Sequence, residues 1–159
     1  MKETLKIRIR AAERGDLSAI VALLAEDQLG QGREDASEPL AACYVDAFDA
    51  LTDDPNQELI VLDGGGTIVA TMQLSFLPGL SRKGSWRCQI EAVRVSQERR
   101  GGGIGRTMIE HAIERARERG CRLVQLTSDR TRDGAHAFYQ QFGFVDSHLG
   151  FKLELEAVP

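Results

Sequence analysis

A glycine-rich turn between an apolar stretch and a helical pattern is the segment best suited to chemistry. The turn follows a strand-like pattern that ends at Val95. It consists of Arg100, Gly101, Gly102, Gly103, Ile104, Gly105 and Arg106. Glycine lets the backbone approach a ligand with no Cβ in the way. A helix start also exposes N–H groups at the positive end of the helix dipole. The turn therefore predicts an anion site, with a plain tight connection as the alternative.

Two common phosphate-binding motifs do not fit this turn. The dinucleotide fingerprint GxGxxG fails because Gly101-x-Gly103 is followed by Arg106, and Gly103-x-Gly105 is followed by Met108. The Walker motif fails because no Gly-Lys-Ser/Thr occurs in the chain. These failures disfavour a nucleotide-binding module and leave the pattern Arg-x-x-Gly-x-Gly.

Glu91 is one of the few acidic residues within the expected central strands. A positioned carboxylate can act as a general base and take a proton from a reacting group. A strand carboxylate beside the turn could accept that proton, directly or through a water molecule. The alternative is a surface carboxylate with no chemical role.

The elements that position these residues follow from the hydrophobic periodicity. Alternation predicts strands over 5–10, 67–77, 86–95 and 151–155, and short apolar runs predict strands over 59–62 and 123–126. Helical spacing predicts helices after the N-cap residues Asp16 and Ser37, from Ile104 to Gly120, and over about 134–141. The sequence therefore predicts one α+β domain over residues 1–159, with a mixed sheet.

Composition limits the class of protein further. The chain has 159 residues, of which 42% are hydrophobic and 28% charged, as expected for one folded domain. Its three cysteines are far apart and form no CxxC pair, which argues against a disulfide framework or a zinc ribbon and favours the reducing cytoplasm. Its longest apolar run covers only 19–25, so we expect neither a signal peptide nor a membrane span.

The net charge of −4 is distributed unevenly. Residues 11–63 contain thirteen acids and two bases, whereas residues 94–132 are rich in arginine. The acidic half could attract a cation, and the basic half an anion. Nucleic-acid binding is a poor fit, because the basic stretch lacks interleaved aromatic residues and the whole chain is acidic.

The pattern Arg100-x-x-Gly103-x-Gly105 after an apolar strand resembles the acyl-CoA signature of the GNAT superfamily of N-acetyltransferases. Downstream, the segment 135–144 resembles the family's A-x-x-x-Y-x-x-x-G-F helix and turn, with Tyr139 as its tyrosine. The opening segment Ile9-Arg10-Ala11-Ala12, followed by Asp16-Leu17, is also typical of the family. The resemblance covers nearly the whole chain.

The resemblance implies an acyl-CoA N-acyltransferase fold, in which helices flank a twisted, mixed and mostly antiparallel sheet. It implies acetyl transfer from acetyl-CoA to a primary amine in a ternary complex. With the acidic stretch 11–63, it predicts that the acceptor is a small cationic amine, attracted by the carboxylates near the 28–38 loop. Glu91 lies on the strand where many members place a catalytic glutamate, and Tyr139 would donate a proton to the leaving thiolate. The cofactor would contact Val93, Arg94, Val95, the turn 100–106 and Tyr139.

One position departs from the family pattern. Many members carry an asparagine seven residues before the tyrosine, and here that position is Arg132. An arginine could meet a CoA phosphate instead. The segments 127–132 and 147–152 are similar to those of one bacterial subgroup.

The sequence leaves several alternatives for function and partners open. A regulatory protein that binds acyl-CoA without catalysis has the same turn, although the presence of both Glu91 and Tyr139 favours the enzyme. His136 and His148 lack metal-ligand spacing with any cysteine or carboxylate, so no metal site is expected. Homodimers are common in the family, but no feature of the sequence indicates one.

Overall fold

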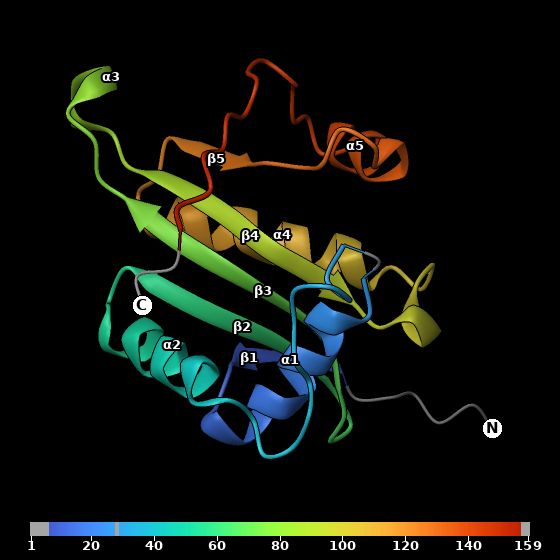
Figure 1. The fold of residues 1–159 in the computed structure, drawn as a ribbon. Helices are drawn as coiled ribbons and strands as arrows, with labels where there is room; N and C mark the ends of the chain where they lie inside the picture. The colour runs from blue at the N-terminus through green and yellow to red at the C-terminus, as the bar shows by residue number, and fades with distance from the viewer. Residues whose placement is uncertain (1–6, 28, 157–159) are drawn as a thin grey trace.

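The computed structural model describes residues 7–27 and 29–156, which form one five-stranded sheet (Figure 1). Its strands follow chain order and are β1 (Ile7–Ala11), β2 (Gln57–Gly64), β3 (Ile68–Leu77), β4 (Arg87–Val95) and β5 (Leu123–Leu126). Neighbouring strands are antiparallel except β4 and β5, which are parallel. The predicted α+β fold with a mixed, mostly antiparallel sheet is confirmed.

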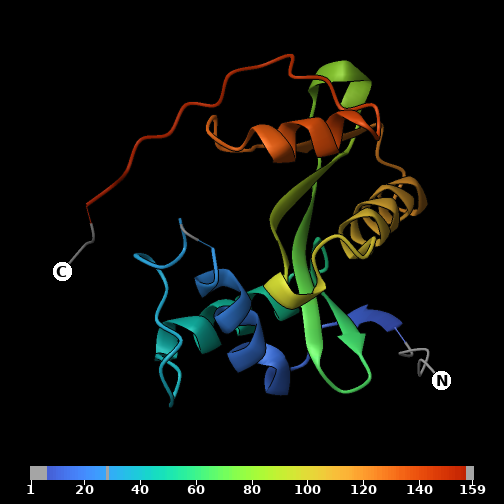
Figure 2. The same cartoon turned by 90° about the vertical axis from the view of Figure 1, so that its right-hand side faces the viewer.

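Helices lie on both faces of this sheet, as Figure 2 shows. They are α1 (Leu17–Ala25), α2 (Ala42–Asp53), α3 (Ser81–Gly84), α4 (Ile104–Glu118) and α5 (Asp133–Gln140), with short 3₁₀ turns η1 (Arg14–Asp16) and η2 (Gln97–Arg99). Helix α4 packs on β3 and β4, whereas α1 and α2 lie against the opposite face. No helix in the described ranges is long and apolar enough to cross a membrane.

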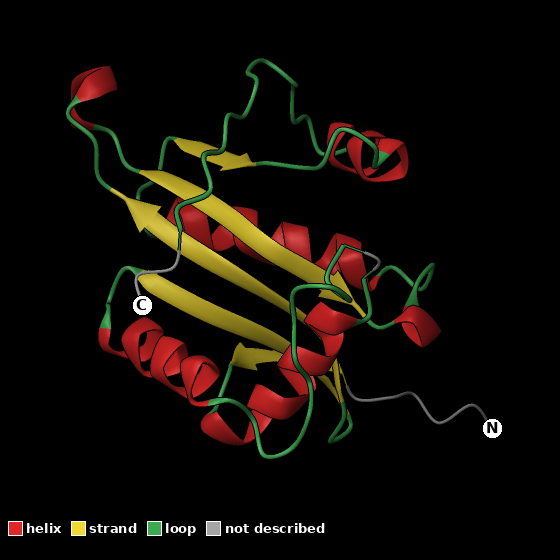
Figure 3. Ribbon diagram, in the orientation of Figure 1, coloured by secondary structure: helices red, strands yellow, loops and turns green. Residues whose placement is uncertain are grey.

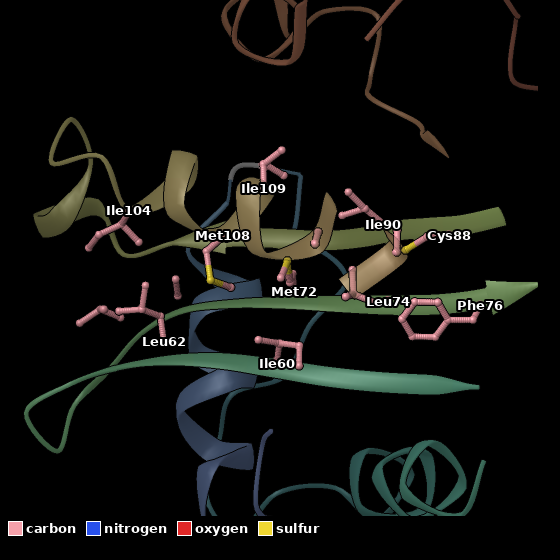
Figure 4. Packing of buried hydrophobic residues seen from close by; sticks show 14 residues of the cluster. Ile60, Leu62, Met72, Leu74, Phe76, Cys88, Ile90, Ile104, Met108 and Ile109 are labelled. Atoms are coloured by element: carbon pink, nitrogen blue, oxygen red, sulfur yellow. The ribbon is translucent and has the colours of Figure 1, made fainter. Parts of the chain in front are cut away.

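The core lies between the sheet and α4. Alternate residues of β2, β3 and β4 point toward this helix, because side chains of a strand alternate between its two faces. Figure 4 shows the resulting cluster, which includes Ile60, Leu62, Met72, Leu74, Phe76, Cys88, Ile90, Met108 and Ile109. Helix α4 ends where predicted, because Gly120 adopts the left-handed conformation at φ 71°.

Arg10 fixes the entry to the first helix. Its guanidinium donates to both carboxylate oxygens of Asp16, at 2.6 and 3.0 Å, and to Asp63 at 3.4 Å. The Arg10 hydrogen bond holds the pKa of Asp16 below its usual value. The end of β1 is thereby tied to η1 and to the neighbouring strand β2.

The structure differs from the prediction at the start of α2 and after α5. The helix predicted from Ser37 begins only at Ala42, because the Ser37 N–H and hydroxyl bond the Asp35 carboxylate in a local turn. The strand predicted over 151–155 is wrong, since Figure 3 shows the chain after α5 without helix or strand as far as residue 156. The predicted start of the first strand, residues 5 and 6, lies outside the described residues.

Truncating the core leucine of β3 should be costly. Leu74 is fully buried, so Leu74→Ala removes buried apolar atoms and leaves a cavity, and we expect a loss of about 2–5 kcal/mol in the free energy of unfolding. Leu80→Ala is the matched control, because Leu80 is 98% exposed, and should stay within about 0.5 kcal/mol of the parent. Urea unfolding followed by circular dichroism measures both variants.

Candidate active site

The strands β4 and β5 part at the point where the site is expected. Their pairing ends at Ile90 and Leu126, whereas β4 continues to Val95. A bulge lies at this point: the register with β3 shifts between Thr71 and Gln73, and Ala92 adopts φ 52°. An alanine in the left-handed region is uncommon, and bulges often re-aim a strand next to an active site.

The parting leaves backbone groups of β4 without a strand partner on one side. The Ser96 N–H bonds the Val69 carbonyl on β3 at 2.8 Å. Because successive N–H groups of a strand point to opposite sides, those of Val95 and Val93 point away from β3 and toward the parting. The arrangement thus has the splayed geometry that fixed oxyanion donors require.

The glycine-rich turn lies between η2 and α4. Gly103 is the N-cap of α4 at φ 82°, and its carbonyl accepts the first helical hydrogen bond, from the Thr107 N–H at 3.0 Å. In the described chain no side chain caps this helix end, so the N–H groups of 104–106 are available to a ligand. A Cβ on Gly103 would meet no atom within 4 Å, so glycine is needed here for its φ angle.

Gly105, in the first turn of α4, faces Phe138 of α5 and Val95 at the end of β4. A Cβ on this glycine would lie at ordinary contact distance, 3.4 Å from Cζ of Phe138 and 4.0 Å from Cγ2 of Val95. The Phe138 ring in turn packs edge-to-face on Tyr139, with centroids 5.3 Å apart. Phe138 therefore links the start of α4 to the predicted proton donor.

Tyr139 carries its hydroxyl proton at neutral pH, as a proton donor must. Burial raises the pKa of Tyr139 above its ordinary value, and the nearby Arg132 and Arg94 only partly offset that effect. The hydroxyl is therefore protonated at neutral pH. Within residues 7–27 and 29–156 it makes no hydrogen bond, so it remains available to a substrate.

Two arginines converge on Asp27, just after α1. Arg94 Nη2 lies 3.2 Å and Arg132 Nη1 3.8 Å from the same Asp27 oxygen. Burial lowers the pKa of Arg94, although Asp27 raises it, and its Nε is buried with no hydrogen-bond partner in the described chain. The cluster joins α1, β4 and the start of α5 and carries one net positive charge.

Glu91 lies on the face of β4 that turns away from α4. It is exposed and pairs in register with Gln73, while Arg94, beyond the bulge, pairs with Thr71 on the same face. Beside Glu91, cross-strand partners form a polar row that consists of Gln57, Ser75, Gln89 and Gln125. Ser75 donates to Gln57 at 2.7 Å and Gln125 donates to Gln89 at 2.7 Å.

Contacts with neighbouring groups fix the side chains of the two arginines of the turn, Arg100 and Arg106. Arg100 Nε donates to the Val95 carbonyl at 3.2 Å, which folds this side chain back onto the end of β4. Arg106 donates to Gln141 at 3.2 Å and lies over the Phe142 ring at 4.8 Å, which ties α4 to α5. Both charges stay beside the turn.

Sequence reasoning missed Asp27 and the polar row. Asp27 is one of many acids in the stretch 11–63, and nothing in its spacing singles it out. The polar row had a usable signal, because Gln and Ser recur at alternate positions of β3 and β4. The predicted groups Glu91, Val93 to Val95, the turn, Arg132 and Tyr139 all lie around the parting of β4 and β5 or on elements that border it.

The comparisons with known proteins agree with this geometry. The sequence model of the Acetyltransferase (GNAT) family matches residues 19–144. The chain belongs to the GNAT family. It is 31% identical over 108 residues, 68% of this chain and 70% of the relative, to the aminoalkylphosphonate N-acetyltransferase of Salmonella typhimurium. It is 32% identical over 90 residues, 57% of this chain and 59% of the relative, to the glucosamine 6-phosphate N-acetyltransferase of Trypanosoma brucei brucei.

Solved structures extend the likeness over almost the whole GNAT chain. A crystal structure of a transcriptional regulator from Bacillus halodurans is 48% identical, with a TM-score of 0.92 over 94% of this chain and 99% of that one. An acetyltransferase from Trypanosoma brucei is 26% identical, with a TM-score of 0.76 over 94% of this chain and 100% of that one. Family and relatives together make this protein an N-acetyltransferase, and GNAT enzymes take their acetyl group from acetyl-CoA.

Gly103→Val tests whether the turn is the anion site. Valine is strained at the positive φ of this position and puts a branched side chain beside the free N–H groups. We expect CoA affinity, measured by isothermal titration calorimetry, to fall at least about tenfold, which corresponds to about 1.4 kcal/mol.

Gly120→Val supplies the matched control. Gly120 has a similar φ of 71° at the opposite end of the same helix, with no atom within 4 Å of its Cβ position. This variant should lose comparable thermal stability but keep CoA affinity. If a folded Gly103→Val protein binds CoA as tightly as the parent, the phosphate site lies elsewhere.

Proposed function

We propose that this protein transfers an acetyl group from acetyl-CoA to the primary amine of a small, cationic acceptor, by direct transfer in a ternary complex. One observation carries the proposal: β4 and β5 part after Ile90 and Leu126, directly before the exposed carboxylate of Glu91, and the half-buried Tyr139 lies on α5, the helix that follows β5. A base, a proton donor and free backbone N–H groups are the three things that this reaction needs.

The described residues fit acetyl-CoA, which supplies an activated acyl thioester when it is bound. The N–H groups of the turn, from Gly101 and Gly102 through Ile104 to Arg106, would hold the pyrophosphate at the positive end of α4. Arg100 and Arg106 would add charge-assisted contacts, and Arg132 would face the CoA from the start of α5. The backbone of Val93 to Val95 would hold the acyl end.

Glu91 and Tyr139 then divide the proton transfers. The Glu91 carboxylate takes a proton from the acceptor ammonium, directly or through a water, and its exposure on β4 allows either route. As the carbon–nitrogen bond forms, the Val93 and Val95 N–H groups stabilise the carbonyl oxygen. As the carbon–sulfur bond breaks, the Tyr139 hydroxyl gives its proton to the leaving sulfur. The nitrogen loses its second proton as the amide forms, and that proton restores the Tyr139 hydroxyl, directly or through water. The chain forms no covalent bond to the acyl group.

The Asp27 cluster supports the last of these steps. Arg94 and Arg132 share one carboxylate between them, so their excess positive charge acts on Tyr139. Positive charge next to a breaking thioester stabilises the negative charge that develops on the leaving sulfur. It also stabilises the negative charge on the Tyr139 oxygen once its proton has been donated. Arg94 and Arg132 thus act as positioning and electrostatic residues.

The acceptor is proposed to be small and cationic because of the acids after α1. Glu34, Asp35 and Glu38 lie in the loop 29–38, and none forms an ion pair with another described residue. Asp27, at the start of this loop, contacts β4 three residues from Glu91. Both enzyme relatives are named for small amine-bearing acceptors, which supports a small molecule over a protein substrate.

A second candidate function is an acyl-CoA-binding regulator that performs no chemistry. It is favoured by the Bacillus halodurans relative, which is described as a transcriptional regulator. The presence of both Glu91 and Tyr139 favours the enzyme. The deciding experiment is thiol release from acetyl-CoA with a pool of amines: amine-dependent turnover supports the enzyme, and tight CoA binding without release supports the regulator.

We place this reaction in the cytoplasm, where thiols stay reduced. All three cysteines are free: Cys43 is exposed, Cys121 is half-buried and Cys88 is buried. Burial raises the pKa of the Cys88 thiol to about 12, so this sulfur is an inert core group. Neither a membrane nor a nucleic acid is proposed as a partner.

Replacing the proposed base tests the mechanism. Glu91→Gln keeps the size of the side chain but removes its basicity, so kcat should fall about 100- to 10,000-fold. Acetyl-CoA affinity should hardly change, because Glu91 is not among the residues proposed to hold the phosphates. The matched control is Glu98→Gln, an exposed acid in η2, which should keep the parent rate. A Glu91→Gln enzyme with the parent rate at every pH would move the base elsewhere.

Salt dependence tests the charge of the acceptor. Raising salt screens exposed charges over about 10 Å at 0.1 M, so the KM for the amine should rise with sodium chloride. In Glu38→Gln that rise should be smaller, because a loop carboxylate is gone, whereas Asp53→Asn at the end of α2 should behave like the parent. A preferred acceptor that is neutral, with a KM indifferent to salt, would contradict the proposed cationic acceptor.

A further inference from the structure

A cavity lies beneath the helices α1 and α2, on the same face of the sheet as Glu91. These two helices contact each other on the face opposite α4 (Figure 2). The cavity has a volume of about 170 Å³ and reaches from the helices to β3 and β4. Its helical wall includes Ile20, Val21 and Leu24 from α1 and Ala47, Phe48 and Leu51 from α2. The proposed proton transfers make no use of this space.

The interior of the cavity is apolar. No charged residue of the described chain lines it. Two of its polar side chains are engaged with the sheet, since the Thr71 hydroxyl donates to the Ile60 carbonyl at 3.1 Å and the Gln73 amide donates to Gln57 at 3.2 Å. A charged group placed here would lose its hydration and find no opposite charge. The interior therefore suits a hydrocarbon group.

Tyr44 connects this cavity to the acidic loop 29–38. Its ring lines the cavity, and its hydroxyl donates to the Glu34 carboxylate at 2.9 Å. The same hydroxyl accepts a hydrogen bond from the Asp35 N–H, also at 2.9 Å. A carboxylate of the loop is thereby held one hydrogen bond away from a lining residue, where it attracts cations.

The cavity also reaches the strand that carries the proposed base. Gln73 and Ala92 line it on the side of the sheet. Gln73 is the register partner of Glu91, and Ala92 follows Glu91 at the bulge of β4. A molecule whose hydrocarbon end fills the cavity can therefore place its polar end beside Glu91.

We propose that the acceptor is a primary amine with a hydrocarbon end of about the size of a benzene ring, and that this end fills the cavity beneath α1 and α2. The inference rests on the proposed function, because Glu91 takes the proton of the same amine. A dry apolar cavity of about 150 Å³ is enough to hold benzene, so the volume here matches a group of this size. The ammonium end stays outside the apolar interior, between Glu91 and the acids of the loop.

Ala47 determines how much of this space is open. It lines the cavity but is also exposed on α2, so its methyl group lies at the rim. A phenylalanine at this position would occupy part of the cavity without removing any buried contact. Ala50 lies almost one turn further along the same helix and is also exposed, but it does not line the cavity. Ala50→Phe is therefore the matched control for Ala47→Phe.

The first experiment measures kcat/KM for n-alkyl primary amines from ethylamine to hexylamine, with saturating acetyl-CoA. These amines have almost the same basicity, so the series varies only the hydrocarbon end. Each added CH₂ should raise kcat/KM about fourfold until the cavity is full, as expected for a buried methylene group. In Ala47→Phe the preference for hexylamine over ethylamine should fall at least about tenfold, since several methylene groups lose their site. Ala50→Phe should keep the parent preference, and thermal unfolding checks that both variants fold.

The second experiment measures binding without reaction, which separates this inference from the proposed function. The same amines are titrated by calorimetry into the protein with CoA, which has no acetyl group to transfer. An affinity that rises with chain length, and does so less steeply in Ala47→Phe than in Ala50→Phe, supports the hydrocarbon site even if no amine is acetylated.

Three results would overturn the inference. Acetylation of the whole series with kcat/KM independent of chain length would leave the proposed function standing but exclude the hydrocarbon end. A chain-length dependence that Ala47→Phe leaves unchanged, or that Ala50→Phe alters equally, would place the hydrocarbon group elsewhere. Absence of binding by every amine of the series would exclude this class of acceptor.

Discussion

The site depends on the end of one strand pairing. Once β4 and β5 separate after Ile90 and Leu126, the N–H groups of Val93 and Val95 have no strand to bond. Unpaired backbone donors are costly when buried, so they persist where a ligand satisfies them. The bulge at Ala92, with its positive φ, re-aims β4 at this point. The most specific part of the site is thus made of backbone, which explains why very different sequences can form it.

Two different forces hold the walls of this opening in place. One is apolar packing: the Phe138 ring lies against Gly105 at the start of α4 and packs edge-to-face on Tyr139. The other is an ion cluster, with Arg94 and Arg132 on Asp27. Burying charge is expensive, and an anionic group beside the surplus positive charge would offset that cost. The charged wall is therefore the one whose stability depends on a bound anion.

Features set by local patterns could be predicted from the sequence, and features set by long-range contacts could not. The ends of α4 and the turn at Gly103 follow from glycine conformations and apolar spacing within a few residues. Asp27 meets Arg94 only because the fold brings α1 to β4, and no local signal marks that pair. The segment 151–155 shows the limit most clearly, since its alternation is that of a strand although the described chain offers it no partner.

The shortest strand of the sheet, β5, forms one wall of the opening. β5 has four residues and one neighbour, yet its last residue marks the point where the site opens. A strand held on one side only is freer to move than one held on both, so the width of the opening depends on how firmly β5 is fixed. In the described chain β4 and α4 are the elements that contact β5 most. These two elements also carry the free backbone N–H groups of the site, so the wall formed by β5 and the donors that face it share one support.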